Sequence, residues 1–466
     1  AVLSMVLFAC GVPKLAQKSP NVVLPDTYND SISTSNSSST FIWKDFFNDP
    51  FLVQLIDSAL SNNRELNITL QEVSILKNDI REKKGEYLPS VGLGASSGIE
   101  KSSRYTRNGS LEANNNIIEN REFPEPLPDF LLGATASWEI DIWNKLRSAK
   151  KSAVLSYLSS VEGRKFMTTN LVAEVASSYY ELLALDSQLE IVLQNIEIQN
   201  KALRIVKLQK QSAKVNELAV KRFEAEVLKN KSARFYLEQK IVETENRINL
   251  LVGRLPQSVP RNAQNFNTVF PAQLTAGVPS ELLANRTDIK QAELAIEAAK
   301  LDVKVAKANF YPKLEINANI GLQAFDPSYF LKTPESLLYN LAGDLIAPLV
   351  NRNAIKANYL SSNNKQIQAI YNYEQTILNA YVEVVNQLSK IENLNKSFDL
   401  KSQQVDALNK SITISSSLFQ SARADYMEVL LTQRDALEAK MELVETKNDQ
   451  LNALVKMYQA LGGGWK

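Results

Sequence analysis

Residues 182–206, LLALDSQLEIVLQNIEIQNKALRIV, lie inside a stretch from Asn144 to Gly253 that contains no proline and a single interior glycine, Gly163. With almost no helix-breaking residues, the stretch can form about a hundred residues of helix. Apolar residues recur in it every three or four positions, which is the spacing of a coiled-coil seam rather than of a globular helix. The seam consists of Leu182, Leu185, Leu189, Val192, Ile196, Leu203 and Val206, with Gln199 as its polar interruption. The stretch therefore predicts a long helix that packs against other helices.

The same pattern occurs again later in the chain. Gln211-Ser212-Ala213-Lys214 matches Gln420-Ser421-Ala422-Arg423, at an offset of 420 − 211 = 209 residues. In both copies a short polar break follows a long helical pattern, and another helical pattern follows the break. We therefore predict an internal duplication that contains two long helical hairpins. The first repeat covers residues 49–278 with its hairpin at 144–253, and the second covers residues 279–466 with its hairpin at 351–461.

The composition excludes several classes of function. The 52 lysine and arginine residues almost balance the 51 aspartate and glutamate residues, so the chain has no electrostatic footprint for nucleic acid. Histidine is absent and Cys10 is the only cysteine, which excludes a His/Cys zinc site and a disulfide within the chain. There is also no phosphate-binding glycine loop. We expect neither an enzyme nor a metal or cofactor site.

The N-terminal residues indicate lipid attachment. An apolar run over residues 1–9, too short to span a bilayer as a helix, ends in Leu7-Phe8-Ala9-Cys10-Gly11 and resembles a bacterial lipoprotein signal cleaved before its cysteine. We interpret residues 1–9 as the remnant of a signal peptide. Residues 10–48 are then an extended segment anchored through lipid on Cys10. The alternative is a leftover signal peptide with an incidental cysteine.

Four stretches of about ten residues have a period of two, which is typical of strands with one apolar face. They lie at about residues 90–100, 129–143, 313–324 and 338–349. Their apolar residues are Val91, Leu93, Ala95 and Ile99; Phe130, Leu132, Ala134, Ala136, Trp138, Ile140 and Ile142; Leu314, Ile316, Ala318, Ile320 and Leu322; and Tyr339, Leu341, Leu345 and Leu349. Residues 102–128 are polar and rich in asparagine, as in an exposed loop. Each repeat therefore has the order helix, strand, strand, long helix, return helix.

The residues before each long helix are of a capping type. Asn144 is expected to cap the first long helix, and Asn351 takes the same place in the second repeat. At 1.5 Å per residue, a helix from Asn144 to Ser212 would be roughly 100 Å long. This length exceeds that of an ordinary domain.

The strand pattern favours a membrane barrel that several chains build together. An apolar face opposite a polar face is typical of outer-membrane strands, because one face contacts lipid and the other contacts water. Four strands cannot close, since a barrel needs at least about eight, and an open edge in lipid leaves backbone groups unpaired. Three copies would supply twelve strands, with the helices packed as a tube below them. The fold class is thus mainly α with a small β part; a soluble helical rod with a small sheet is the alternative.

Three separated motifs resemble a known family. They are WEIDIW at residues 138–143, PSELLANRTDI at residues 279–289 with Ala292-Glu293, and YQALGGGW at residues 458–465. All three resemble the TolC-like outer-membrane factors of tripartite efflux systems, and among these the lipoprotein branch typified by OprM and CusC. The sequence departs from the family pattern at Thr287, where proline is usual, and at Ala213 and Ala422, where tip glycines are common.

The resemblance implies a homotrimer with a twelve-stranded barrel in the outer membrane and a helical tunnel through the periplasm. Such a trimer is a passive conduit for drugs or other small toxic compounds. It opens when a periplasmic adaptor bound to an inner-membrane pump of the RND type docks on the hairpin tips. Two alternatives stay open: the conduit of a type I protein secretion system, and a lipid-anchored structural coiled coil without a pore.

The resemblance also assigns residues to a gate and to a docking surface. The periplasmic gate is expected at Arg423, Met427, Glu428 and Leu431. Adaptor contact is expected at Gln211, Ser212, Ala213, Lys214, Gln420, Ser421, Ala422 and Arg423. The alternatives are that Met427 and Leu431 are ordinary seam residues, and that the small tip residues serve only the turns. Glu139 and Asp141 are expected to line water on the polar face of a strand.

Overall fold

The computed structural model describes residues 12–28, 42–262, 266, 277–350, 352–421, 423–463 and 465. They form two compact units, which we treat separately. The sheet unit comprises Ala1–Ser19, Ser74–Leu158 and Leu294–Tyr371, and the hairpin unit comprises Pro20–Val73, Ser159–Glu293 and Asn372–Lys466. Within the described ranges, no helix combines the length and the apolar character that a bilayer crossing requires.

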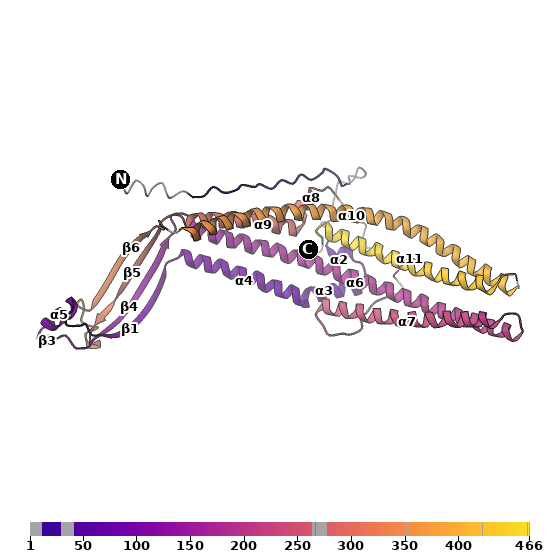
Figure 1. Cartoon of the computed structure of the whole chain (residues 1–466), viewed down its shortest axis with the longest axis horizontal. Helices are drawn as coiled ribbons and strands as arrows, with labels where there is room; N and C mark the ends of the chain where they lie inside the picture. The colour runs from indigo at the N-terminus through magenta and orange to yellow at the C-terminus, as the bar shows by residue number, and fades with distance from the viewer. Residues whose placement is uncertain are drawn as a thin grey trace. The chain divides into compact units, whose positions relative to one another are not determined.

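Helices dominate both repeats, and each repeat contributes two strands to one sheet (Figure 1). The helices are α2 (Trp43–Phe46), α3 (Pro50–Asn62), α4 (Arg64–Tyr87), α5 (Arg107–Asn114), α6 (Lys145–Gln211), α7 (Glu217–Val252), α8 (Glu281–Asn285), α9 (Thr287–Ala308), α10 (Asn353–Gln420) and α11 (Tyr426–Ala460), with a 3-10 turn η4 (Pro327–Tyr329). The strands are β1 (Ser90–Glu100), β2 (Asn116–Ile118), β3 (Arg121–Glu122), β4 (Leu127–Ile140), β5 (Lys313–Ala324) and β6 (Leu337–Ile346). The predicted order of elements is confirmed in both repeats.

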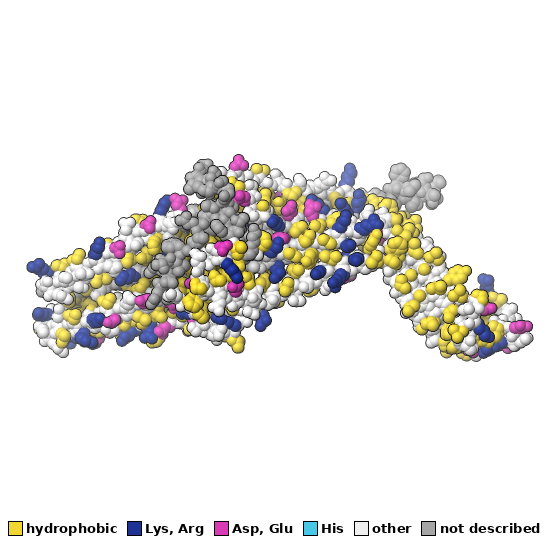
Figure 2. All heavy atoms as spheres, turned by 180° about the vertical axis from the view of Figure 1, so that it is seen from behind, with side chains coloured by type: hydrophobic (Ala, Val, Ile, Leu, Met, Phe, Trp, Pro, Cys, Tyr) yellow, Lys and Arg dark blue, Asp and Glu magenta, His cyan; other side chains and the backbone are white. Residues whose placement is uncertain are grey.

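The sheet unit is built on an antiparallel sheet in the order β1-β4-β5-β6. Its register places the predicted apolar residues on one face: Leu93 lies opposite Ala134, Ala134 opposite Ile320, and Ile320 opposite Tyr339. The neighbouring row, on the other face, is Gly92, Thr135, Asn319 and Asn340. Hydrophobic side chains lie over these strands in Figure 2. Because β1 and β6 each have one strand neighbour in this sheet, both are edge strands.

Two strands end earlier than predicted, and the helix cap is also different. β4 ends at Ile140 and β6 at Ile346, so Ile142 and Leu349 lie outside the strands. The carboxylate of Asp141 accepts hydrogen bonds from the backbone N–H groups of Leu146 (3.1 Å) and Arg147 (2.9 Å). Asp141 therefore caps α6 and does not line the polar strand face. The predicted cap, Asn144, adopts a left-handed φ of 56° at the turn, and Asn351 lies outside the described residues.

The predicted loop between the first two strands has secondary structure of its own. Residues 107–114 form α5, and β2 pairs with β3 in a short hairpin. Thr106 caps α5, since its hydroxyl accepts from the N–H of Gly109 at 3.3 Å. The polar composition indicated exposure correctly, but it did not reveal that Thr106 would cap a short helix.

The hairpin unit has its core where the short helices α2 and α3 pack against the long ones. Phe46 of α2 stacks on Tyr458 of α11 with ring centroids 4.4 Å apart. Tyr179 of α6 is fully buried and donates to the carboxylate of Asp49 at 2.8 Å, and Asp49 also caps α3. Gly253 ends α7 in the left-handed conformation, with φ 76°, which is common for a glycine just after a helix.

Lys447 of α11 lies inside this helical packing. It is 1% exposed, and its ammonium lies 5.9 Å from the ring centroid of Phe398 on α10. Burial lowers the pKa of Lys447 from the usual 10.5 to about 8. Because the folded protein releases this proton at a lower pH than the unfolded chain, stability should rise with pH between about 8 and 10.5.

Replacing Lys447 by methionine is expected to raise the free energy of unfolding near neutral pH by about 3 kcal/mol. The difference between the pKa of Lys447 in the unfolded chain and its pKa in the folded protein corresponds to about that free energy. The variant should also lose the rise in stability above about pH 8. Urea denaturation at neutral and alkaline pH measures both effects. Lys456→Met on the same helix is the control, since Lys456 is exposed. A less stable Lys447→Met variant would show that the ammonium makes net favourable contacts.

Candidate functional site: the hairpin tips and the foot of the sheet

The two hairpin tips of the hairpin unit share one small apolar core, which we call the tip cluster. Its buried members are Val206 of α6, Ala219, Val220 and Phe223 of α7, and Leu430 of α11. Partly buried side chains around it include Phe419, Tyr426 and Met427. Because residues from both hairpins bury the same surface, a movement of one tip must disturb the packing of the other.

The first tip closes tightly although it lacks glycine. Ala213 adopts φ 55°, and its N–H donates to the Lys210 carbonyl at 2.9 Å. The N–H of Lys214 donates to the Gln209 carbonyl at 2.9 Å. Together these two hydrogen bonds form a Schellman motif, in which an α-helix ends with one residue in the left-handed conformation. Alanine thus occupies a conformation that favours glycine, at a local cost of roughly 1 kcal/mol.

The predicted docking residues lie at the surface of the tips. Gln211, Ser212, Ala213, Lys214, Gln420, Ser421 and Arg423 are exposed or partly exposed, and Ala422 lies outside the described residues. Within the described chain neither Lys214 nor Arg423 makes an ion pair, so each tip presents a free cation. The neighbouring lysine, Lys210, forms an ion pair with Glu217. The hydrogen bond from Lys210 is the main reason why the pKa of the Glu217 carboxyl is lowered.

The four predicted gate residues do not share one environment. Met427 is partly buried against the tip cluster, and its sulfur accepts a hydrogen bond from Arg222 of α7 at 2.7 Å. Arg423 and Glu428 are at least partly exposed, and Leu431 is 39% exposed. The resemblance assigned Met427, Glu428 and Leu431 to the gate, but it could not show that α7 would cover Met427. Arg423, Glu428 and Leu431 therefore remain the gate candidates with accessible side chains.

Arg286 is buried in the hairpin unit and forms two ion pairs. The sequence motif that contains it did not reveal this role. Its guanidinium pairs with Asp288 at 2.6 Å and with Glu383 of α10 at 2.6 Å, and it donates to the carbonyl of Ala460 in α11 at 3.1 Å. The segment between α8 and α9 is thereby tied to both helices of the second hairpin. Thr287, the departure from the family pattern, is buried beside it and begins α9.

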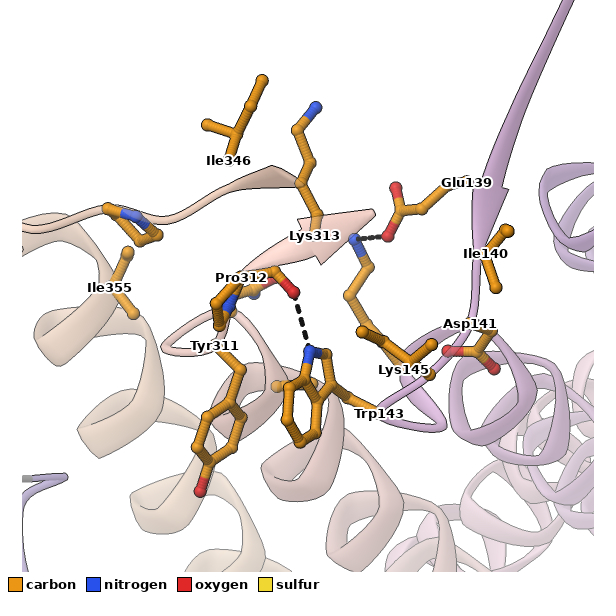
Figure 3. Close-up of a pocket in the computed structure, with 14 residues that line it drawn as sticks. Glu139, Ile140, Asp141, Trp143, Lys145, Tyr311, Pro312, Lys313, Ile346 and Ile355 are labelled. Carbon is orange, nitrogen blue, oxygen red and sulfur yellow. Dashed lines mark hydrogen bonds and ion pairs between the residues drawn. The ribbon is translucent and has the colours of Figure 1, made fainter. Parts of the chain in front are cut away.

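At the foot of the sheet, aromatic and charged residues join strands to helices around a hollow of about 390 Å³ (Figure 3). Trp143 stacks on Tyr311 with centroids 4.8 Å apart, and its indole N–H donates to the carbonyl of Pro312 at 2.7 Å. Lys145 pairs with Glu139 of β4 at 2.6 Å, and Asp141 caps α6. Both carboxylates therefore hold the junction together, and neither is left as a free acid or base.

Comparisons with known proteins agree with this architecture. The model of the family described as "Outer membrane efflux protein" matches residues 55–254 and 278–463. The pyoverdine export outer membrane protein OpmQ of Pseudomonas aeruginosa is 28% identical over 93% of this chain and 89% of its own length. The probable outer membrane lipoprotein SilC of Salmonella typhimurium is 25% identical over 92% of this chain and 89% of its own. The solved structure of CusC shares the fold, with a TM-score of 0.81, 23% identity and coverage of 97% and 99% of the two chains.

Long duplicated hairpins joined to a sheet with one apolar face define an outer-membrane channel subunit. The chain belongs to the outer membrane efflux protein family, because the family model covers most of both repeats. The predicted family and the outer-membrane location are confirmed. Among the alternatives, membership favours the two conduit functions over a coiled coil without a pore.

Proposed function

We propose that the protein is the outer-membrane conduit of a tripartite efflux system of the RND type, and that it works as a homotrimer. In this arrangement three sheets join edge to edge as a twelve-stranded barrel, and the hairpins form the tunnel below it. The chain supplies a passage, and its partners supply the energy: a pump in the inner membrane and a periplasmic adaptor. Drugs or other small toxic compounds are the proposed cargo. OpmQ is described as a pyoverdine exporter, so small-molecule export is represented among the relatives.

The observation that carries the proposal is a sheet with an apolar face and two edge strands. An edge strand presents unpaired N–H and C=O groups, and these cannot remain unpaired in lipid. In the register, rows of apolar residues span all four strands, whereas the opposite face is mainly small or polar. Pairing β6 of one copy with β1 of the next satisfies both edges, and ring closure then separates a lipid-facing surface from a watery lumen.

Cysteine cross-linking between the edges tests this pairing. In a Cys10→Ser background, single cysteines at Gly92, Gly94 or Ser96 of β1 are combined with one at Asn340 or Ala342 of β6. Within one chain the two edges are three strand spacings, about 14 Å, apart, which is too far for a disulfide. At least one pair should give covalent dimers and trimers on a denaturing gel. If every pair yields only monomers, edge pairing is refuted.

The hairpin tips are the proposed adaptor surface, supported by their exposure and by the unpaired cations Lys214 and Arg423. Reversing both charges, with Lys214→Glu and Arg423→Glu, is expected to abolish efflux in a complementation assay, because an acidic partner surface would then be repelled. Gel filtration should show unchanged trimers. The control is the pair Lys229→Glu and Lys231→Glu on α7, away from the tips. Retained efflux in the tip variant would contradict docking through these cations.

For the gate we propose rings of Glu428 and Leu431 around the threefold axis. The accessibility of both side chains supports this proposal. An apolar ring closes a pore by excluding water, and a hydroxyl would weaken that barrier. Leu431→Ser should therefore raise the conductance of the closed channel several-fold in planar bilayers. Leu418→Ser on α10, where the leucine is similarly exposed, serves as the control. Equal closed-state conductance in the two variants would remove Leu431 from the gate.

Lipid on Cys10 is proposed as the membrane anchor. Cys10 itself lies outside the described residues, and the chain just beyond it contacts the sheet unit. Val12 and Leu15 pack against Phe310 and Tyr359 in an apolar cluster there. The description of SilC as a lipoprotein supports the same assignment. Mass spectrometry of the native N-terminus should show diacylglycerol on Cys10, and an unmodified thiol would refute the anchor.

A further inference from the structure

A second hollow in the sheet unit lies at the start of α6 and belongs to none of the sites above. It measures about 610 Å³ and is lined by Tyr87 of α4, Arg147, Lys150, Lys151, Val154 and Leu155 of α6, and Leu301 of α9. Three cations and an aromatic ring thus stand beside three aliphatic side chains. We call it the basic hollow.

The cations of the basic hollow have no ion-pair partner in the described chain. Arg147 donates to the hydroxyl of Tyr87 at 2.9 Å, and its guanidinium lies 5.2 Å from the centroid of that ring. No ion pair within the described residues involves Arg147, Lys150 or Lys151. Other lysines of α6 are paired, as Lys165 with Glu162 at 2.7 Å and Lys201 with Glu197 at 2.7 Å illustrate. A concentration of unpaired positive charge in a concave site favours an anionic occupant.

Two contacts show which face of the sheet the basic hollow continues. Lys145 pairs with Glu139, which lies on the polar face of β4. Arg147 contacts Tyr87, whose carbonyl accepts the indole N–H of Trp138 at 3.1 Å. Trp138 lies opposite Ile316 on the apolar face. The basic hollow is therefore a continuation of the apolar face and not of the polar one.

This position matches the boundary of a bilayer. Tryptophan and tyrosine concentrate where hydrocarbon meets headgroups, and lysine and arginine just beyond the apolar surface attract anionic lipid. The apolar rows of the sheet end at Trp138 and Ile140, and the three cations follow within the first two turns of α6. Val154, Leu155 and Leu301 add aliphatic surface that would suit the glycerol and upper acyl region of a lipid.

We propose that the basic hollow binds the phosphate headgroup of an anionic phospholipid from the periplasmic leaflet of the outer membrane. Arg147, Lys150 and Lys151 hold the phosphate, Tyr87 orients Arg147, and the aliphatic wall contacts the lipid body. The proposal rests on the placement of the apolar sheet face in the membrane but not on the cargo, the partners or the gate. Bound lipid would fix the height of the sheet in the bilayer at the point where strand becomes helix.

The test uses the purified, delipidated full-length protein and native mass spectrometry with added phosphatidylglycerol. The wild-type protein should bind phosphatidylglycerol at one site per chain, and zwitterionic phosphatidylcholine much more weakly. Replacement of all three cations, Arg147→Gln, Lys150→Gln and Lys151→Gln, should raise the Kd on the order of a hundredfold, given about a fivefold effect for each charge. Lysine-to-arginine exchange at Lys150 and Lys151 should preserve binding.

The matched control removes the same charge elsewhere: Lys229→Gln, Lys231→Gln and Arg234→Gln on α7, all exposed residues. It should bind lipid as the wild-type protein does. Three results would each overturn the proposal. The two triple variants could lose phosphatidylglycerol binding equally, the variant of the basic hollow could bind as tightly as the wild type, or the wild type could bind phosphatidylglycerol and phosphatidylcholine equally well. The last measurement adds glycerol 3-phosphate at millimolar concentration as a competitor of the lipid. Displacement of the lipid by it would show a soluble-phosphate site instead, and the cross-linking result for the sheet edges would be unaffected.

Discussion

Replacing Arg286 by methionine is expected to lower the free energy of unfolding of the hairpin unit by about 3–5 kcal/mol, which is the usual effect of removing one partner of a buried ion pair. The guanidinium is 5% exposed and makes a two-point contact with Asp288, with Nε at 3.0 Å and Nη2 at 2.6 Å from its oxygens. Without it, the Asp288 carboxylate, which is 14% exposed, loses its cation, and the Ala460 carbonyl loses its donor. Both groups would remain desolvated.

The consequence should reach the second hairpin, because Arg286 joins α10 through Glu383 and α11 through Ala460. Chemical denaturation followed by far-ultraviolet circular dichroism measures the loss. Arg434→Met is the control: Arg434 is half exposed, and its ion pair within the described residues is with its neighbour Asp435 at 3.1 Å, so its loss should cost less than about 1 kcal/mol. Arg286→Lys should fall between the two, since lysine cannot form the planar double contact. A loss for Arg286→Met no greater than the control would contradict the assigned role.

Periodicity predicted the elements of this fold well because the same physical constraint generates pattern and structure. A strand alternates faces, so Phe130, Leu132 and Ala134 had to share one side, and the register confirms it. Long-range partners leave no such pattern in the sequence. Arg286 meets residues 97 and 174 positions away, and Arg222 meets Met427 from the other hairpin. Spacing defines a helix face, but it does not state which helix covers that face.

The helix caps show a second limit. Asp141 and Asn144 are both good capping residues, and they stand three positions apart. Which of them caps α6 depends on where the chain leaves the sheet, a place at which Trp143 is hydrogen-bonded to the carbonyl of Pro312 from a distant part of the chain. The basic hollow was missed for a related reason. Arg147, Lys150 and Lys151 have the pattern of an ordinary polar helix start until Tyr87 and Leu301, from other parts of the chain, complete the site.

Replacing Gly133 by valine is expected to prevent correct formation of the sheet. Gly133 of β4 lies opposite Gly321 of β5 and Gly94 of β1, so that three glycines form one row on the polar face. A Cβ at Gly133 would lie 2.8 Å from the carbonyl oxygen of Ile320 and 3.0 Å from the Cα of Gly321. These are backbone atoms in a paired strand, and they cannot move aside without loss of ladder hydrogen bonds.

The close approach is reciprocal, since a Cβ at Gly321 would lie 2.7 Å from the carbonyl oxygen of Leu132. The glycine row therefore marks a place where the backbones of β4 and β5 leave no room for a side chain on the polar face. Overpacking of this kind typically costs about 1–3 kcal/mol in a core, and a clash with backbone should exceed that range. We expect Gly133→Val to accumulate as unassembled protein without heat-modifiable oligomers in outer-membrane fractions.

Gly98→Val is the matched control for this prediction. Gly98 lies on β1 on the same polar face, and a Cβ added there would have no neighbouring atom within 4 Å. The added side chain then meets only open space, so assembly and channel conductance should be close to those of the wild-type protein. Gly133→Ala should show an intermediate defect, because it introduces the same clash with a single carbon. If Gly133→Val assembles as well as Gly98→Val, the strands can separate at the glycine row, and the close approach is not needed for assembly.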